Sequence, residues 1–163
     1  MTIRKSRILQ KTIAGNANKY YSYREAWSRI KLAQENGFYL EAIAIQESII
    51  SDRLISYLHS KQEITFLTND KNFPGFSKLI KKWHSEFPSG LSSGNYSNLI
   101  EAVDQWRLSR NQIIHAIVKS KPGQPTQSVD LFLQQAKEAA KAGENIAKEI
   151  CNWSKKKKRE TEK

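Results

Sequence analysis

Arg107, Arg110, Asn111 and His115 lie within nine consecutive residues and bring two guanidinium groups, an amide and an imidazole close together in the chain. Side chains of these types could cut RNA without a metal ion, because histidine ordinarily exchanges a proton near neutral pH and arginine carries a permanent positive charge. Whether they can act together depends on the secondary structure that positions them.

Residues 96–120 are predicted to form the helix that carries these groups. Apolar residues recur there at spacings of three and four, which places them on one side of a helix; they are Leu99, Val103, Trp106, Ile113 and Ile117. Arg110 falls at the centre of this apolar stripe, where burying an unpaired guanidinium would be costly. Arg107, Asn111 and His115 follow one another at intervals of four residues and form a second row beside the stripe.

Glu47 is a matching anomaly in the helix predicted over residues 38–62. It lies on one helical row with Ile43 and Leu54, where an apolar residue is expected. If the two helices pack against each other, Glu47 and Arg110 could form an ion pair inside the protein. The alternative is that each charged group reaches solvent at the edge of the bundle.

Arg110, Asn111, three further residues and His115 together resemble the Arg-X4-6-His motif of HEPN domains, which are helical ribonucleases of toxin–antitoxin and phage-defence systems. The polar Asn111 fits the family's preference after the arginine. Arg53 and His59 show the same bare spacing, but they would lie about 240° apart on a helix. We therefore do not regard that second pair as a site.

The resemblance implies a metal-independent endoribonuclease that acts on single-stranded RNA. In this mechanism His115 takes the proton of a ribose 2′-hydroxyl, Arg110 offsets charge on the attacked phosphate, and Asn111 orients the imidazole or holds a phosphate oxygen. The product is a 2′,3′-cyclic phosphate, and DNA cannot react because it lacks the hydroxyl. Arg107 and Glu47 are supporting candidates. The resemblance also implies a two-fold homodimer in which two copies of the motif face each other.

The composition indicates one domain with basic ends. A chain of 163 residues with 39% hydrophobic residues can bury a single core. Its net charge of +11 lies mostly in residues 1–19 and 154–163, which leaves only +2 on residues 20–153. We therefore expect a basic N-terminal arm (1–19), a HEPN-like helical bundle (20–153) and a basic C-terminal tail (154–163). The ends could bind phosphates, or they could simply be solvated.

The hydrophobic pattern predicts an all-α, single-domain bundle of four to five helices. Glycine, proline and serine separate the helical segments, and no alternating β pattern interrupts them. The predicted helices span residues 22–35, 38–62, 76–87, 96–120 and 128–153. Ser128 is the expected N-cap of the last one. Each of the four tryptophans falls in a different helix, as core residues would.

The remaining features concern location and partners. Cys151 is the only cysteine, which excludes an intrachain disulfide and favours a reducing cytoplasm. The absence of a long apolar run argues against a membrane span, and neither the cysteine nor the scattered histidines have zinc-ligand spacing, so no metal or cofactor is expected. The expected partners are RNA, a second copy of the chain and an antitoxin or defence-system protein. The alternative function is a non-catalytic helical module that binds RNA or a protein.

Overall fold

The computed structural model describes residues 16–66 and 72–163, and five α-helices make up most of these ranges. The helices are α1 (Asn16–Glu35), α2 (Tyr39–Ser60), α3 (Phe76–Glu86), α4 (Leu99–Ala116) and α5 (Val129–Thr161). No β-strand is assigned within the described ranges, where an isolated bridge between Ser93 and Tyr96 closes a turn ahead of α4. The predicted all-helical bundle is therefore confirmed.

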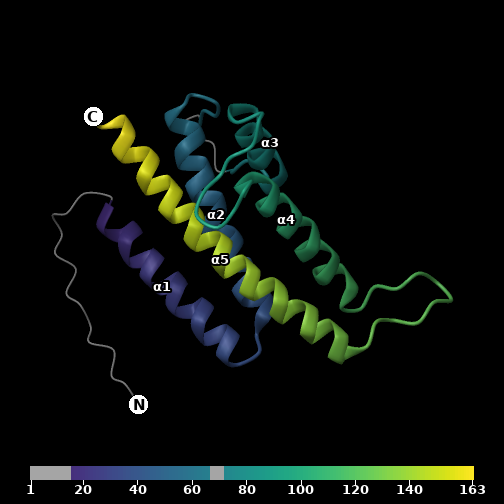
Figure 1. The fold of residues 1–163 in the computed structure, drawn as a ribbon. Coiled ribbons are helices and arrows are strands. Elements are labelled where there is room, and N and C mark those ends of the chain that lie inside the picture. Colours follow the sequence, from purple (N-terminus) through teal and green to yellow (C-terminus); the bar gives the residue numbers. More distant parts are fainter. Residues whose placement is uncertain (1–15, 67–71) are drawn as a thin grey trace, which may run out of the picture.

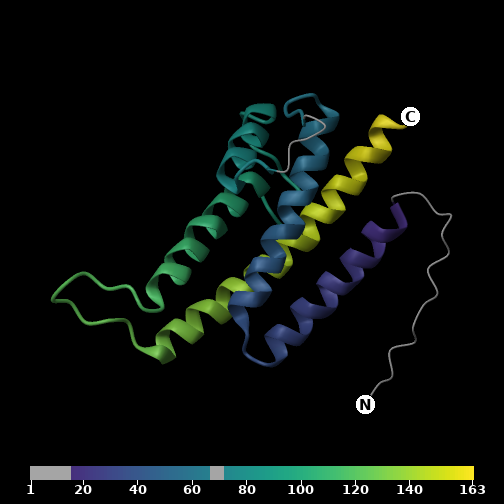
Figure 2. The same ribbon diagram turned by 180° about the vertical axis from the view of Figure 1, so that it is seen from behind.

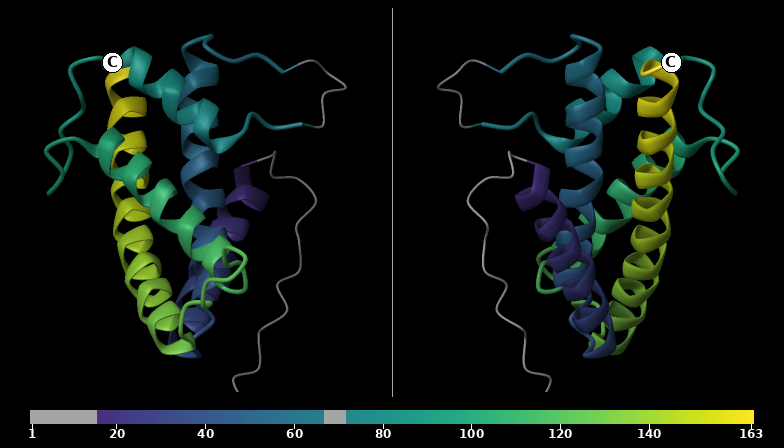
Figure 3. Two further views of the ribbon diagram at one scale, coloured as in Figure 1. Left: turned by 90° about the vertical axis from the view of Figure 1, so that its right-hand side faces the viewer. Right: turned by 90° about the vertical axis from the view of Figure 1, so that its left-hand side faces the viewer.

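The helices α2 and α5 form the centre of the bundle. α5 is the longest helix, with 33 residues, and it packs most extensively against α2. α1 lies along one flank of this pair, while α4 lies along the other (Figure 1), and the view from behind shows the same order (Figure 2). α3 crosses the end of the bundle at which α2 and α5 terminate (Figure 3).

Aromatic rings fill the space between α2, α3 and α5 at that end. The centroid of the Trp153 ring lies 4.8 Å from that of Tyr57 and 5.2 Å from that of Trp83. Phe87 closes the cluster at 6.1 Å from both Tyr57 and Trp153. The prediction that the tryptophans belong to the core is confirmed for three of the four, whereas Trp27 of α1 is only half-buried.

A close approach of three helices fixes α4 against α5. Trp106 of α4 donates its indole N–H to the carbonyl oxygen of Ala139 at 2.9 Å. The fully buried Gln46 of α2 donates its side-chain N–H to the next carbonyl, that of Ala140, at 2.7 Å. Gly143 makes this arrangement feasible, because a Cβ there would meet Gln46 and lie 2.6 Å from the Trp106 ring.

The ends of the bundle differ from those predicted. α1 begins at Asn16, six residues before the expected start, and Lys19 is tied to α2 by an ion pair with Asp52 at 2.7 Å. Of the predicted basic arm over residues 1–19, the first fifteen residues lie outside the described ranges, and the remainder forms the first turn of α1.

The predicted C-terminal tail is not a separate segment, because α5 continues through it to Thr161. Ion pairs between Lys157 and Glu160 (2.8 Å) and between Lys158 and Glu162 (3.9 Å) follow the three- and four-residue spacing of a helix and favour the extension. The predicted start is confirmed, because the Ser128 hydroxyl accepts the backbone N–H of Leu131 at 3.3 Å.

α4 ends at Ala116, four residues before the predicted end. Ile117 and Val118 follow it with 46% and 75% of their surface exposed, so a further turn would not bury them against another helix.

Candidate functional site

α4 carries the candidate residues, and its core-facing side fixes their directions. Asn98 caps the helix by accepting the backbone N–H of Glu101 at 3.4 Å. Val103, Trp106 and Ile113 are then almost completely buried against the rest of the bundle. Because these residues fix the rotation of α4 about its own axis, every other position on the helix has a set direction.

Arg110 points into the bundle and pairs with Glu47 of α2. Its Nη2 contacts Oε2 of Glu47, so of the two alternatives left open by the sequence the ion pair is the one present. The two side chains are only 17% and 26% exposed, respectively. The guanidinium carbon lies 5.9 Å from the centroid of the Phe76 ring, and the buried Nε has no hydrogen-bond partner among the described residues. Arg110 therefore lies between α2, α3 and α4.

Burial raises the pKa of the Glu47 carboxyl above its ordinary value, and the neighbouring Arg110 opposes this shift. The raised pKa means that the positive charge of Arg110 does not fully compensate Glu47 for its lost hydration. The pair is thus held in place by packing on both sides as well as by attraction between its charges.

His115 lies on the opposite, exposed side of α4, in a row that is more polar than the sequence analysis recognised. The row consists of Arg107, Asn111, His115 and, just beyond the helix end, Lys119. Lys119 Nζ lies 3.2 Å from Nδ1 of His115. Because an ammonium group can only donate, this contact fits an imidazole that carries no proton on Nδ1. The four-residue spacing between His115 and Lys119 is the signal that could have revealed this partner.

Arg107 is held at the other end of this row. Its Nε donates to Oδ1 of Asp104 at 2.8 Å, and only 18% of its side chain is exposed. Asp104 was not among the predicted residues, although it lies three positions before Arg107 and a helix brings such positions together. Its carboxylate neutralises part of the arginine's charge.

One chain does not bring Arg110 and His115 together. Five residues of α-helix turn through about 140° beyond one full turn, so the guanidinium faces α2 while the imidazole faces solvent. Asn111 lies between them on the helix surface and is half-buried. In this structure the exposed imidazole of His115 therefore does not share a site with the guanidinium of Arg110.

A groove of about 570 Å³ runs between α4 and α5 on the flank of α4 away from Asn111. We call it the α4–α5 groove. Its polar lining consists of Gln105, Ser109, Gln112, Gln127, Gln135 and Glu138. The buried residues Trp106 and Ile113 also line it. Amide side chains both donate and accept hydrogen bonds, so this groove suits a polar, neutral group better than a charged one.

Arg53 and His59, which show the same bare spacing as the motif, lie in two separate environments. The guanidinium of Arg53 lies 4.2 Å from the centroid of the Tyr23 ring, at the junction of α1 and α2. His59 is exposed near the end of α2, and its ring centroid lies 6.0 Å from that of Phe66. The two groups point to different parts of the molecule, in agreement with their dismissal on helical spacing.

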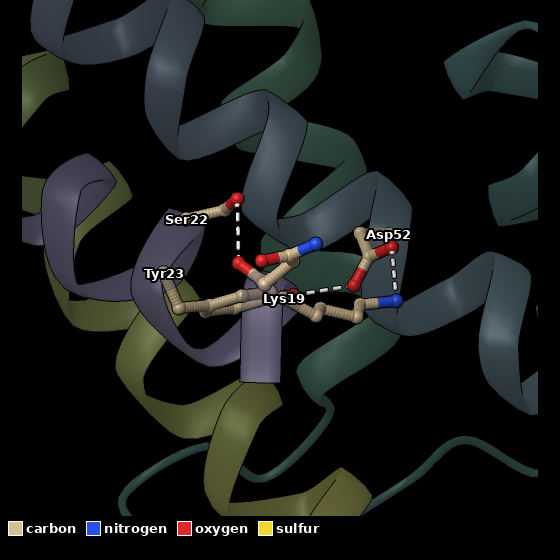
Figure 4. Close-up of polar contacts among 5 residues, drawn as sticks. Lys19, Ser22, Tyr23 and Asp52 are labelled. Carbon is tan, nitrogen blue, oxygen red and sulfur yellow. Dashed lines mark hydrogen bonds and ion pairs between the residues drawn. The ribbon is translucent and has the colours of Figure 1, made fainter. Parts of the chain in front are cut away.

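A polar cluster between α1 and α2 was also missed from the sequence. The Tyr23 hydroxyl donates to Oδ2 of Asp52 at 2.6 Å, while Lys19 Nζ contacts Oδ1 at 2.7 Å (Figure 4). Burial, and then the hydrogen bond to Asp52, raise the pKa of the Tyr23 phenol. The two carboxylate oxygens of Asp52 are thus bound by Tyr23 and Lys19 of α1, and the cluster holds α1 against α2.

Two absences can be stated for the described residues. Among residues 16–66 and 72–163, no group of three or more His, Cys, Asp or Glu side chains is placed to hold a metal ion. Within the same ranges, no helix combines the length and the apolar character that crossing a bilayer requires.

Comparisons of the chain with models of protein families, with curated proteins and with solved structures found no match. The function of α4 and its surroundings therefore has to be argued from the residues and geometry described above.

Proposed function

We propose that this protein is a metal-independent endoribonuclease that cleaves single-stranded RNA by attack of the ribose 2′-hydroxyl. The observation that carries the proposal is the polar row at the end of α4, in which the half-buried Asn111 is followed by the exposed His115 and, just beyond the helix, by the exposed Lys119. It combines a proton acceptor, an amide and a positive charge on a surface that a polymer can reach.

In the proposed reaction, the 2′-hydroxyl replaces the ammonium of Lys119 as the donor to Nδ1 of His115. The imidazole takes the proton, the 2′-oxygen forms a bond to the adjacent phosphorus, and the bond to the 5′-oxygen breaks. The leaving 5′-oxygen takes up a proton from water, a 2′,3′-cyclic phosphate remains on the upstream fragment, and the imidazolium of His115 returns its proton to the solvent. Lys119, freed from the ring, then offsets the growing negative charge of the phosphate.

A two-fold homodimer is part of this proposal. Three apolar residues beside His115 remain exposed at the end of α4: Ile114 at 40%, Ile117 at 46% and Val118 at 75%. A second copy that covers them would bring the two rows with their histidines and lysines together on one surface. Ile114→Glu combined with Val118→Glu should therefore give monomers in analytical ultracentrifugation, whereas wild type should sediment as a dimer. Wild-type monomers at micromolar concentration would contradict this part.

The biological setting is proposed from the resemblance to HEPN domains alone. A ribonuclease of this type would act in the cytoplasm as a toxin or a phage-defence effector, together with an antitoxin or another defence protein. The buried, unpaired Cys151 is compatible with a reducing compartment.

A non-catalytic module that binds RNA or a protein is the second candidate. The observation in its favour is the position of Arg110, which the motif places in the site but which pairs with Glu47 away from His115. In that case Arg110 holds the bundle together, and the polar row binds a partner without cutting it.

Cleavage of a labelled single-stranded RNA in a buffer containing a metal chelator distinguishes the two candidates. Wild type should cut it, and His115→Ala should be inactive because the proton acceptor is lost. Lys119→Ala should cut at least about tenfold more slowly, since one positively charged group is removed. His59→Ala is the matched control, because it removes another exposed imidazole. Equal rates for wild type and His115→Ala would refute the proposed mechanism.

A further inference from the structure

The outward side of α5 carries a line of positive charge that the sequence analysis did not identify. Five exposed basic residues lie within a sector of about 40° on the side of the helix opposite its core-facing residues. They are Lys137, Lys141, Lys148, Lys155 and Arg159, and we call them the basic stripe. At about 1.5 Å per residue the stripe is about 33 Å long. Figure 1 views α5 from a side that no other helix covers.

The charges of the stripe are poorly balanced. Between its ends, the only acidic residue on the same side of α5 is Glu144, which pairs with Lys148 at 2.5 Å. No acidic side chain of the described residues forms an ion pair with any other member of the stripe. Lys137 and Lys141, like Lys155 and Arg159, are four residues apart, a spacing at which like charges destabilise a helix. The stripe is therefore not arranged for the stability of α5.

The α4–α5 groove meets α5 between Gln135 and Ile146, so it flanks only the part of the stripe that holds Lys137 and Lys141, and there it carries complementary chemistry. Gln105 and Gln112 of α4 line it together with Gln135 of α5. Such amides can donate to and accept from the edges of unpaired bases. Glu138 lies at the rim between groove and stripe, where its carboxylate would repel a phosphate. The rim would keep a phosphate backbone on the stripe while the bases turn toward the groove.

We propose that single-stranded RNA binds along α5, with its phosphates on the basic stripe and, beside Lys137 and Lys141, its bases toward the α4–α5 groove. RNA as the partner rests on the proposed function, but this binding does not require cleavage. A single strand is favoured over a duplex because its base edges are free and its backbone can follow a straight line of charges. The end of α5 that was predicted to be a separate tail is then one end of this binding surface.

The test measures the affinity of the full chain for a fluorescent single strand over a series of salt concentrations. The strand is 2′-O-methylated, so it cannot be cut by attack of the 2′-hydroxyl. Lys141→Gln combined with Lys155→Gln should weaken binding about tenfold near 0.1 M salt. The slope of log affinity against log salt should become shallower by about 1.4, because each phosphate contact on a single strand contributes about 0.7.

Lys78→Gln combined with Lys81→Gln is the matched control, because it removes the same charge from two exposed helical positions of α3. It should leave both affinity and slope close to those of wild type. Equal losses in the two double variants would mean that only net charge matters and would overturn the stripe as the binding surface.

The groove has a separate readout. Gln105→Ala combined with Gln112→Ala should weaken binding several-fold with an unchanged salt slope. An abasic strand should bind wild type, the α3 control and this groove variant with the same low affinity, and it should bind the stripe variant more weakly still. An abasic strand bound as tightly as the normal one, or a duplex bound more tightly, would overturn the place given to the bases. Binding to vesicles of anionic phospholipid but not to the RNA strand would overturn the choice of RNA.

These results can be separated from those of the cleavage assay. A protein that binds the strand through the stripe but never cuts RNA would refute the proposed ribonuclease and leave the binding surface intact. If the protein cuts RNA but the stripe variant and the α3 control lose the same affinity for the strand, only the proposed binding surface is refuted.

Discussion

Replacing Glu47 with alanine should destabilise the protein, because Arg110 would then lie between α2 and α4 without its carboxylate. Removing one partner of a fully buried ion pair costs about 3–5 kcal/mol. Here the side chains of Arg110 and Glu47 are 17% and 26% exposed. Water can partly solvate the stranded guanidinium, so we expect about 2 kcal/mol. For a chain of 163 residues, this lowers Tm by about 4–8 °C.

Replacing both partners should have a much smaller effect. The raised pKa of Glu47 indicates that its desolvation is not fully repaid by Arg110. Glu47→Leu combined with Arg110→Met removes both charges and supplies apolar atoms that can pack near Phe76. We expect the double variant to lie within about 1 kcal/mol of wild type, or to be more stable.

The assay is thermal unfolding at neutral pH, followed by circular dichroism, for wild type and both variants. A double variant as unstable as Glu47→Ala would show that attraction between the charges holds the helices together, and would refute our reasoning. A Glu47→Ala protein with the wild-type Tm would refute it too. RNA cleavage by the double variant then tests Arg110 separately, because a folded but inactive protein would place its guanidinium in the reaction.

Three further predictions concern stability. Gly143→Ala should lower the free energy of unfolding by about 2 kcal/mol or more, because the new Cβ would overlap Gln46 and Trp106; Asn145→Ala, at an exposed position on the same helix, should change it by no more than about 0.5 kcal/mol in urea denaturation. The Tyr23 phenol has a raised pKa in the folded protein, so the stability that it contributes is present below its ordinary pKa of 10.0 and is lost as pH rises above that value. The difference in Tm between wild type and Tyr23→Phe should therefore narrow from pH 9 to pH 11, and a constant difference would contradict the assignment. Truncation after Trp153 should lower Tm by no more than a few degrees, because residues 154–163 include no apolar side chain that could pack on the bundle. A larger fall in a melting experiment would show that the last turns of α5 do contribute to packing.

Helical periodicity was sufficient to predict the features that depend on burial. It identified the core-facing side of α4 and the anomalous Arg110 within it, and it left the pairing of that residue with Glu47 as one of two alternatives. The same periodicity places His115 about 140° from Arg110, although the sequence analysis treated the two as members of one motif. A motif records which residues occur at a spacing, whereas the packing of α4 decides where each side chain points.

Features that depend on polar contacts between distant residues could not be predicted in the same way. Lys19 forms an ion pair with Asp52, which lies 33 positions away in the chain. Because this contact is not local, the sequence around Lys19 does not predict that α1 starts early. The extension of α5 could have been inferred from the spacing of its lysines and glutamates, but the dense positive charge suggested a solvated tail instead. The stripe became visible only when the core-facing side of α5 was known.

The most direct test of the central claim is a change to one atom of the substrate. Wild-type protein is given an RNA that it cuts at one mapped position, in chelator-containing buffer, and the same RNA with a single 2′-deoxyribose immediately 5′ of that cut. Attack by the 2′-hydroxyl predicts that the deoxy substitution abolishes cleavage at that position, and that the product of the unmodified RNA ends in a 2′,3′-cyclic phosphate or its hydrolysis product. Cleavage of the deoxy-substituted RNA at the unmodified rate would contradict the mechanism.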